Sequence, residues 1–222
     1  VPFNKAGWKK IVKKYNGFLP VTIKAVPEGL VIPNKMVLFT IELTIDDEDL
    51  VWLPSWLETF LMKVWYICTV ATRSYYVKEM LLKHGKMTSD NPFIDFQFHN
   101  FGDRAATCVE AAAFGGVAHL VCFKGTDNIN CLRYAHLLMN QDINDIGFSI
   151  PATEHSTTTS WGKEGEFDMV DNHIETYKDD TLVKAIAGVG DSYDIYEFTD
   201  KITSGKFKEK IESDNYPKFI ER

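Results

Sequence analysis

The chain has 222 residues, of which 45% are hydrophobic and 25% charged, and this ordinary globular composition allows a sizeable core. Its formal net charge of -7 argues against a general nucleic-acid binder, because such proteins carry a basic surface. No apolar run reaches the roughly 18 residues that a membrane span needs. We therefore expect neither a nucleic-acid partner nor a membrane partner.

The four cysteines lie in apolar or helical patterns and form no Cys-x-x-Cys pair. We expect free, buried thiols, which indicates a reducing compartment and a cytoplasmic protein. The sequence begins at Val1, and residues 217–222 read as a strand cut short. We therefore expect a fragment of a longer chain.

Residues 1–52 predict a helix followed by a small antiparallel β unit. Apolar residues recur at helical spacing from Asn4, a suitable cap, to Tyr15. The period then changes to two, which predicts strands over residues 21–25, 30–32 and 36–43.

Residues 53–94 predict a connecting helix and a loop. Apolar side chains repeat at helical spacing through residues 52–85, with room for one break, and Gly85 is a natural stop. The large aromatic residues of this segment indicate burial on more than one face.

From residue 95 to residue 222, predicted strands alternate with predicted helices. The strands cover residues 96–101, 120–124, 146–151, 182–189 and 218–221. The helices cover residues 107–120, 128–140 and 165–177, with one or two more around Gly205 in residues 192–214. This alternation predicts β–α units and a parallel sheet, either open or closed into a barrel.

Polar groups follow all of these strands, at the ends where parallel α/β proteins collect catalytic residues. In chain order they are His99, Asn100, Asp103 and Arg104, then Lys124, Thr126 and Asp127, then Glu154, His155 and Ser156, then Asp191, Ser192 and Asp194, and finally Arg222. We expect these groups to share one active-site face.

The residue types indicate which chemistry such a face could perform. Arg104 and Arg222 can neutralise a phosphate, a carboxylate or an amide oxygen. Phe101 offers a stacking face for a flat ring, and Asp127 can accept hydrogen bonds from an amide NH2. His155, beside Glu154 in the sequence, could shuttle protons or accept a phosphoryl group.

Structural interpretations stand beside these. A strand-end arginine commonly forms a surface ion pair, and Asp191 and Asp194 could be helix caps. His119 is expected to pack in the core. The remaining helical histidines are expected to be solvated, and they are His84, His136 and His173. No two histidines share a metal-ligand spacing with carboxylates on one element, so we expect no protein-held zinc.

Several sequence runs resemble the nicotinamide phosphoribosyltransferase family over nearly all of the chain. They include Ile23-Lys24-Ala25-Val26-Pro27-Glu28-Gly29, Phe101-Gly102-Asp103-Arg104, Phe123-Lys124-Gly125-Thr126-Asp127, Pro151-Ala152-Thr153-Glu154-His155-Ser156 and Asp191-Ser192-Tyr193-Asp194-Ile195-Tyr196. The resemblance implies an α/β fold with an incomplete irregular (β/α) barrel of the type II phosphoribosyltransferase kind. Its first five strands would lie in residues 95–222. The resemblance also implies a homodimer with active sites at the interface.

The family transfers a phosphoribosyl group from phosphoribosyl pyrophosphate to nicotinamide, giving nicotinamide mononucleotide and pyrophosphate, with Mg2+ bound to the donor. By resemblance, Phe101 and Arg222 flank the pyridine ring, and Asp127 binds the ring's amide. The other residues that match pocket positions are His99 and Arg104, near the donor, and Ser149 and Ile150, in the pocket wall.

His155 matches the histidine that ATP phosphorylates in this family, with Glu154 and Asp191 beside it, so ATP is expected as an optional coupling substrate. Asp127 would attract the NH2 of nicotinamide and repel the carboxylate of nicotinate. The alternatives are a nicotinate phosphoribosyltransferase and a non-catalytic truncated homologue.

The chain departs from the family pattern at two positions near the expected pocket. Asp103 stands where the family usually has tyrosine, and Ala105 stands where it usually has glycine. A carboxylate next to Arg104 could weaken the field of that arginine on a phosphate. Because the chain stops at Arg222, we expect these residues alone to form an incomplete and inactive site.

Overall fold

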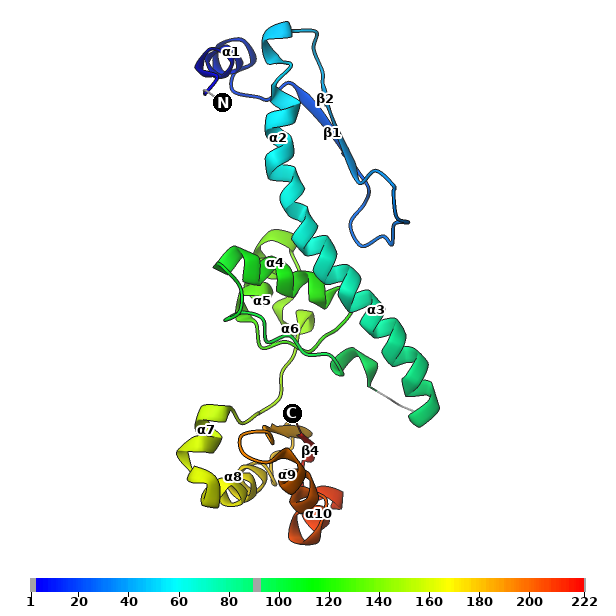
Figure 1. The fold of residues 1–222 in the computed structure, drawn as a ribbon, viewed down its shortest axis with the longest axis vertical. Coiled ribbons are helices and arrows are strands. Elements are labelled where there is room, and N and C mark those ends of the chain that lie inside the picture. The colour runs from blue at the N-terminus through cyan, green and yellow to red at the C-terminus, as the bar shows by residue number, and fades with distance from the viewer. Residues whose placement is uncertain (1–2, 90–92, 222) are drawn as a thin grey trace. The chain divides into compact units, whose positions relative to one another are not determined.

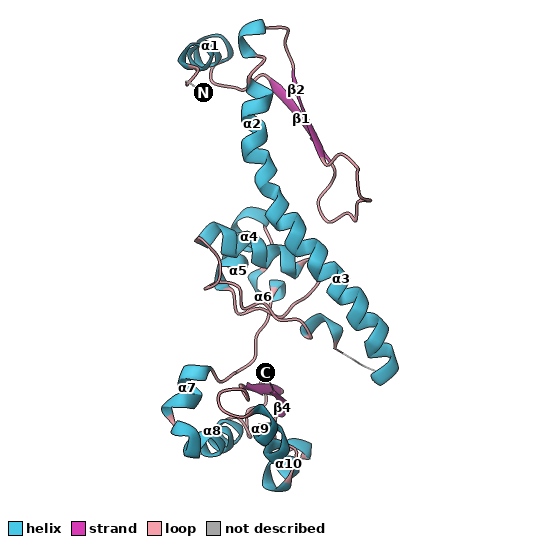
Figure 2. Cartoon of the chain, in the orientation of Figure 1, coloured by secondary structure: helices cyan, strands magenta, loops and turns pink. Residues whose placement is uncertain are grey.

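The computed structural model describes residues 3–89 and 93–221 of the chain (Figure 1). The chain divides into two compact units, residues 1–147 and residues 148–222. Helices predominate in both, and within the described residues each unit contains a two-stranded sheet (Figure 2). The protein is therefore a mixed α/β protein, as the alternating sequence pattern predicts.

The elements of the first unit are α1 (Lys5–Tyr15), β1 (Val21–Ala25), β2 (Phe39–Leu43), η1 (Glu48–Leu50), α2 (Leu53–Leu61), η2 (Met62–Val64), α3 (Trp65–Thr88), η3 (Ile94–Phe96), α4 (Val109–Leu120), α5 (Ile129–Met139) and α6 (Ile143–Ile146). The elements of the second unit are α7 (His155–Ser160), α8 (Gly162–Thr176), β3 (Ala185–Gly188), α9 (Ile195–Ile202), α10 (Gly205–Glu212) and β4 (Lys218–Glu221).

Helix α1 begins where the sequence predicts. The Asn4 side chain accepts a hydrogen bond from the backbone N–H of Gly7 at 3.0 Å, which satisfies one of the unpaired donors of the first turn. Ile11 is buried with Leu50 and Leu53 in a small apolar cluster. The cap and the buried face of α1 confirm the prediction for residues 4–15.

The antiparallel unit is smaller than the sequence predicts. Strands β1 and β2 pair antiparallel, with Val21 opposite Leu43 and Ala25 opposite Phe39. The predicted strand at residues 30–32 is wrong, because this run lies in the irregular connection and finds no strand to pair with. Leu30 and Val31 are instead exposed.

The long helix is confirmed, and so is its single break. Helix α2 continues directly into α3 through the 3-10 turn η2 (Figure 1). Gly85 does not stop the helix, which continues to Thr88. Lys78 fastens α3 to the chain that follows, because its ammonium group donates to Asp95 Oδ1 at 2.8 Å and to the carbonyl oxygen of Cys122 at 2.6 Å.

Helices α4 and α5 pack closely because the contact face of α4 carries small residues. Ala112, Ala113 and Gly116 are buried. The side chain of Asn128, the N-cap of α5, donates to the carbonyl oxygen of Ala112 at 2.8 Å and accepts from the Cys131 N–H at 3.1 Å. Both helices lie within one or two residues of the predicted ranges.

The second unit packs α8, α9 and α10 around a parallel strand pair. Strand β3 pairs parallel with β4, with Ala185 opposite Lys218 and Gly188 opposite Glu221. The buried side chains between them include Ile186, Phe198 and Ile202. One or two helices were predicted around Gly205, and the structure has two, α9 and α10. The predicted strand at residues 218–221 is confirmed.

Three of the predicted parallel strands do not form as regular strands. Residues 96–101 contribute only Asn100, which forms a parallel bridge with Thr126. Residues 120–124 lie in no strand, and residues 146–151 are followed by a parallel bridge between Ala152 and Ala187. The apolar runs at residues 120 and 146 instead complete α4 and α6. Short apolar runs have the same composition in a buried helix end and in a buried strand, so the sequence pattern did not separate the two.

The cysteines are free, as predicted, but they are not all buried. Cys131 is buried, Cys122 is half-buried, and Cys68 and Cys108 are exposed. In the described ranges 3–89 and 93–221, the helices lack the combination of length and apolar character that crossing a bilayer requires.

Candidate active site

Two strand ends meet in the first unit at the residues that the sequence singles out. Asn100 donates its backbone N–H to the carbonyl oxygen of Gly125 at 3.0 Å, and Asp127 donates its N–H to the carbonyl oxygen of Asn100 at 3.0 Å. This pattern is a short parallel ladder. It fixes the register of residues 99–101 against residues 125–127.

The register places the predicted side chains on one face. Side chains alternate along a strand, so His99 and Phe101 lie on the face opposite to Asn100, and Gly125 and Asp127 lie on the face opposite to Thr126. Thr126 faces the interior, where its hydroxyl accepts from the Asn128 N–H at 3.1 Å. The other face carries His99, Phe101 and Asp127 together.

These three residues touch. His99 Nε2 lies 2.9 Å from Asp127 Oδ1. The rings of His99 and Phe101 have centroids 4.6 Å apart and are inclined by 34°. The His99 side chain is 14% exposed and that of Asp127 39%, so the carboxylate stands at the surface with the imidazole behind it. The arrangement offers a stacking ring next to an oriented hydrogen-bond acceptor.

Arg104 lies in the turn that follows, exposed, between the Phe101 strand end and α4. The Ala105 N–H donates to the carbonyl oxygen of Gly102 at 3.3 Å, which closes this turn. The carboxylate of Asp103, the residue that departs from the family pattern, accepts from the Asn130 amide of α5 at 3.0 and 3.1 Å. Asp103 therefore ties the turn to α5.

A second set of predicted residues meets in the other unit. Residues 151–153 run alongside β3, since the Ala187 N–H donates to the carbonyl oxygen of Pro151 at 2.9 Å and the Thr153 N–H donates to that of Ala187 at 3.0 Å. The Thr153 hydroxyl then accepts from the Val189 N–H at 2.9 Å. These bonds bring the two strand ends together.

His155 and Asp191 extend from these strand ends and meet. His155 Nε2 lies 2.9 Å from Asp191 Oδ1, and both side chains are more than half exposed. A carboxylate on one ring nitrogen orients the imidazole and leaves Nδ1 for other chemistry. The helix-cap alternative for Asp191 is thus not what the structure has, whereas Asp194 does cap α9 by accepting from the Tyr196 and Glu197 N–H groups, each at 3.0 Å.

Glu154 is the N-cap of α7. Its carboxylate accepts from the Ser156 N–H at 2.7 Å and also from the Ser156 hydroxyl. Ser149 is exposed and Ile150 half-buried in the irregular segment before Pro151. Arg222, predicted to flank the ring, lies outside the described residues.

The remaining histidines have mixed outcomes. His119 is a core residue, as predicted. It stacks on Phe123, its Nε2 lies 3.1 Å from the carbonyl oxygen of Gly125, and burial lowers its pKa. His84 and His136 are exposed, as predicted. The prediction for His173 is wrong: its Nε2 is buried where α8 packs against the Pro151 and Ala187 strands, and burial lowers its pKa.

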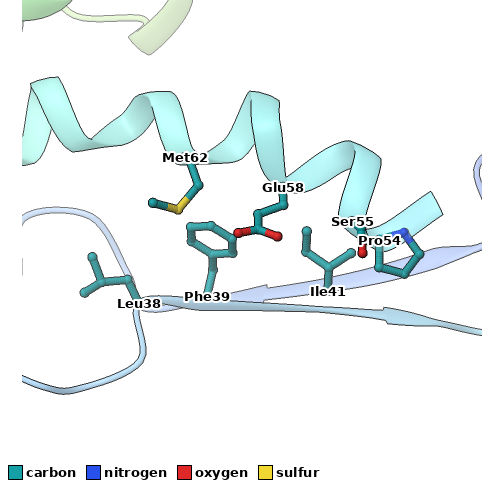
Figure 3. Close-up of a pocket in the computed structure, with 7 residues that line it drawn as sticks. All are labelled: Leu38, Phe39, Ile41, Pro54, Ser55, Glu58 and Met62. Atoms are coloured by element: carbon teal, nitrogen blue, oxygen red, sulfur yellow. The ribbon is translucent and has the colours of Figure 1, made fainter. Parts of the chain in front are cut away.

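A groove elsewhere in the first unit lies between α2 and β2 (Figure 3). Its lining is mostly apolar and consists of Leu38, Phe39, Ile41, Pro54, Ser55, Glu58 and Met62. None of the predicted site residues lines it. Over the described ranges, no group of three or more His, Cys, Asp or Glu side chains is arranged to hold a metal ion.

Two residues that shape these sites are not among the predicted site residues. Thr153 joins two strand ends through its hydroxyl, and Gly125 lies on the face of His99 and Asp127. The signal for Gly125 was available, because a period of two across residues 125–127 puts it on the same face as Asp127. Thr153 carries no comparable local signal.

The protein is a mixed α/β protein in which each unit carries a His–Asp contact at the ends of short parallel β segments. The sequence pattern of the nicotinate phosphoribosyltransferase (NAPRTase) family matches residues 96–220, which is more than half of the chain. The chain belongs to this family.

Three curated relatives carry a more particular name. The chain is 46% identical to a nicotinamide phosphoribosyltransferase of Xanthomonas campestris pv. campestris over 197 aligned residues. The alignment covers 88% of this chain and 41% of that protein. It is 32% identical to that of Acinetobacter baylyi, over 68% of the chain and 30% of the relative. It is 30% identical to the nicotinamide phosphoribosyltransferase of Mycoplasma genitalium, in an alignment that covers 84% of this chain and 39% of the relative. The chain thus spans 41% or less of the length of these relatives.

Proposed function

We propose that the protein containing this chain transfers the phosphoribosyl group of phosphoribosyl pyrophosphate to nicotinamide, giving nicotinamide mononucleotide and pyrophosphate for NAD salvage. The observation that carries the proposal is the cluster on the face of residues 99–101 and 125–127, where His99 Nε2 contacts Asp127 Oδ1 at 2.9 Å beside the Phe101 ring. The names of the relatives support the same reaction.

The ring-binding role follows from these side chains. Phe101 is 51% exposed and can stack on a flat pyridine ring. Asp127 can accept a hydrogen bond from the amide NH2 of nicotinamide. Nicotinate has a carboxylate at this position, and two facing carboxylates repel, so the site rejects the acid through an unfavourable contact. Arg222 would flank the ring on its other side, and Ser149 and Ile150 would contribute the pocket wall.

We further propose that the strand pairs belong to an irregular (β/α) barrel of the type II phosphoribosyltransferase kind. Two observations support this, since successive barrel strands pair in parallel. Asn100 forms a parallel bridge with Thr126. Ala152 forms a parallel bridge with Ala187 of β3, and β3 in turn pairs in parallel with β4. In this arrangement, residues 1–52 form the N-terminal helix and β unit, residues 53–94 the connecting helix and loop, and residues 95–222 the first five barrel strands.

Catalysis would consist mainly of positioning and charge stabilisation. The departing pyrophosphate develops negative charge, which Arg104 is suited to stabilise, while the stacked ring is held in line for attack. Mg2+ would arrive with the pyrophosphate donor. Bound Mg2+ would neutralise donor phosphate charge.

His155 is proposed to accept a phosphoryl group from ATP, with ADP leaving. Asp191 engages Nε2 at 2.9 Å, so Nδ1 is the ring nitrogen left to attack, and the carboxylate stabilises the positive charge that develops on the ring. Glu154 lies beside this histidine as the cap of α7. Phosphorylation would add negative charge near the pyrophosphate site and couple ATP hydrolysis to product formation.

A homodimer with active sites at the subunit interface and a cytoplasmic location complete the proposal. Because the chain spans 41% or less of the length of these relatives, the activity is proposed for the whole protein. The 222 residues alone are proposed to be inactive.

Asp127→Ser tests the proposed function. In the full-length protein, we expect the ratio of kcat/KM for nicotinamide over nicotinate to fall by about tenfold or more, because the substitution removes both the attraction for the amide and the repulsion of the acid. Steady-state assays with each ring give the ratio. Asp145→Ser, which removes an exposed carboxylate of α6, is the matched control and should leave the ratio unchanged.

The alternatives give different outcomes in the same assays. A protein that prefers nicotinate before any substitution is the nicotinate enzyme. A full-length protein that binds nicotinamide in calorimetry but turns over neither ring is a non-catalytic homologue. An unchanged substrate ratio in Asp127→Ser would remove the role proposed for Asp127.

A further inference from the structure

The space beside Gly125 determines where the imidazole of His99 can lie. A Cβ atom at this position would lie 2.7 Å from His99 Nδ1 and 3.4 Å from Cγ, which is too close for the ring to stay where it is. The backbone of Gly125 is not in the left-handed region that favours glycine. Glycine is therefore required at position 125 because the His99 ring occupies the space of a Cβ atom, and not because the backbone adopts a conformation that only glycine favours.

The ladder prevents the two strand ends from moving apart to relieve such a clash. Asn100 is hydrogen bonded through its N–H to Gly125 and through its carbonyl oxygen to Asp127, both at 3.0 Å. These bonds flank the contact on both sides. A side chain at position 125 would therefore displace the imidazole and leave the strands in register.

The imidazole that occupies this space joins the two proposed ring-binding groups. It contacts Asp127 Oδ1 through Nε2 at 2.9 Å and packs against the Phe101 ring at 4.6 Å between centroids. When Asp127 is ionised it only accepts hydrogen bonds, so Nε2 must carry the proton in this contact. The contact fixes the rotation of the carboxylate.

We propose that His99 is a positioning residue that fixes the Asp127 carboxylate and the Phe101 ring for amide recognition, and that Gly125 determines specificity by leaving room for it. The proposal rests on the function proposed above for Asp127. A carboxylate with a fixed orientation binds an amide NH2 without first losing rotational freedom, so preorganisation strengthens the preference for nicotinamide.

Four variants of the full-length protein test this. Gly125→Ala fills the space, and His99→Ala removes the contact. His99→Gln retains an NH2 donor at a similar reach. Gly102→Ala is the matched control, because a Cβ there meets only side-chain atoms of Asn100 at 3.6 and 3.7 Å, an ordinary contact distance.

We expect Gly125→Ala and His99→Ala to raise the KM for nicotinamide by about tenfold, with a smaller change in kcat, and to lower the preference for nicotinamide over nicotinate by a similar factor. His99→Gln should recover most of this loss, and Gly102→Ala should behave like the unaltered protein. A purely structural role for His99 would lower the amount of folded enzyme and leave KM and substrate preference unchanged, which would overturn the proposal.

A readout without turnover separates this inference from the proposed function. The 15N NMR shifts of the His99 ring report which nitrogen carries the proton, and we expect the Nε2–H form in the unaltered protein and in Gly102→Ala. Gly125→Ala should change that signature. An unchanged signature would overturn this inference even in an active enzyme, whereas absence of pyridine turnover beside a changed signature would overturn the proposed function alone.

Discussion

Gly116 shows how single atoms set the packing of α4 against α5. A Cβ atom on Gly116 would lie 2.7 Å from Asn128 Nδ2 and 2.9 Å from Cys131 Sγ. Asn128 is fully buried and uses that amide group to bond the carbonyl oxygen of Ala112. Neither the capping side chain nor the buried cysteine can retreat without losing a buried hydrogen bond.

Gly116→Ala is therefore expected to destabilise the first unit by about 1–3 kcal/mol, the usual cost of overpacking a tight core. Gly115→Ala on the same helix is the control. Its Cβ would meet only the phenol end of Tyr66, at 2.9 Å from the hydroxyl, which can shift. The gain in helix propensity of about 1 kcal/mol should then make Gly115→Ala neutral or stabilising. Urea unfolding of both variants measures the difference, and equal losses would contradict this account.

The residues of the candidate site were predictable from the sequence, but their contacts were only partly so. Strand ends carrying His99, Asp127, His155 and Asp191 follow from the alternation of strands and helices. The two His–Asp contacts depend on pairing between segments 28 and 36 residues apart in the sequence, which no local pattern encodes. The place of Gly125 beside Asp127 follows from the period of two across residues 125–127.

At the scale of elements, α1 is held to the loop before η1 by charge as well as by its apolar face. Asp47 accepts hydrogen bonds from Lys10 Nζ at 2.6 Å, from Lys14 Nζ at 3.3 Å and from the Tyr15 hydroxyl at 3.2 Å. The hydrogen bond from Lys10 is the main reason that the pKa of Asp47 falls from its ordinary value of 3.8 to about 2. The ionised carboxylate thus favours the folded unit.

This contribution has a defined pH dependence. A carboxyl group whose pKa is lower in the folded state stabilises that state above the unfolded pKa of 3.8 and loses this effect as the pH falls through about 2. Above pH 4, we expect Asp47→Asn to melt at a lower temperature than the unaltered protein. This gap between the two melting temperatures should narrow as the pH falls toward 2. Asp46→Asn, at the exposed neighbouring position, is the control. A gap that is constant with pH would show that the loss comes from packing. Fluorescence of Trp8 and Trp52, which pack against the apolar cluster of Ile11, Leu50 and Leu53, follows the transition.

Helices were predicted better than strands, for a physical reason. The cap at Asn4, the break between α2 and α3 and the cap at Asn128 are local signals within a few residues of each helix. A strand exists only where a partner pairs with it, so the apolar run at residues 30–32 formed none. The run at residue 120 completed α4 because helical spacing continued through it.

At the scale of the whole molecule, the chain has separate cores. Ile11, Leu50 and Leu53 belong to one cluster in the first unit, and Ile186 and Phe198 belong to another in the second. The sequence pattern predicted one continuous run of β–α units from residue 95 to residue 222. The two compact units divide at residue 147, inside the range 95–222 that we propose for the first five barrel strands. Hydrophobic periodicity reports which face of an element is buried but not which core receives it.

Phe198→Ala tests whether the two units unfold separately. Phe198 is fully buried, and its ring stacks on that of Phe167 at 5.8 Å between centroids, so truncation should cost the second unit about 3–5 kcal/mol through lost burial and a cavity. Native-state hydrogen exchange should then show lower protection for amides of α8 and β3 and unchanged protection for those of α4 and α5. Leu182→Ala, at a side chain that is 89% exposed, should change neither set. Equal loss of protection in α4 and β3 would mean that residues 1–147 and 148–222 unfold as one cooperative body.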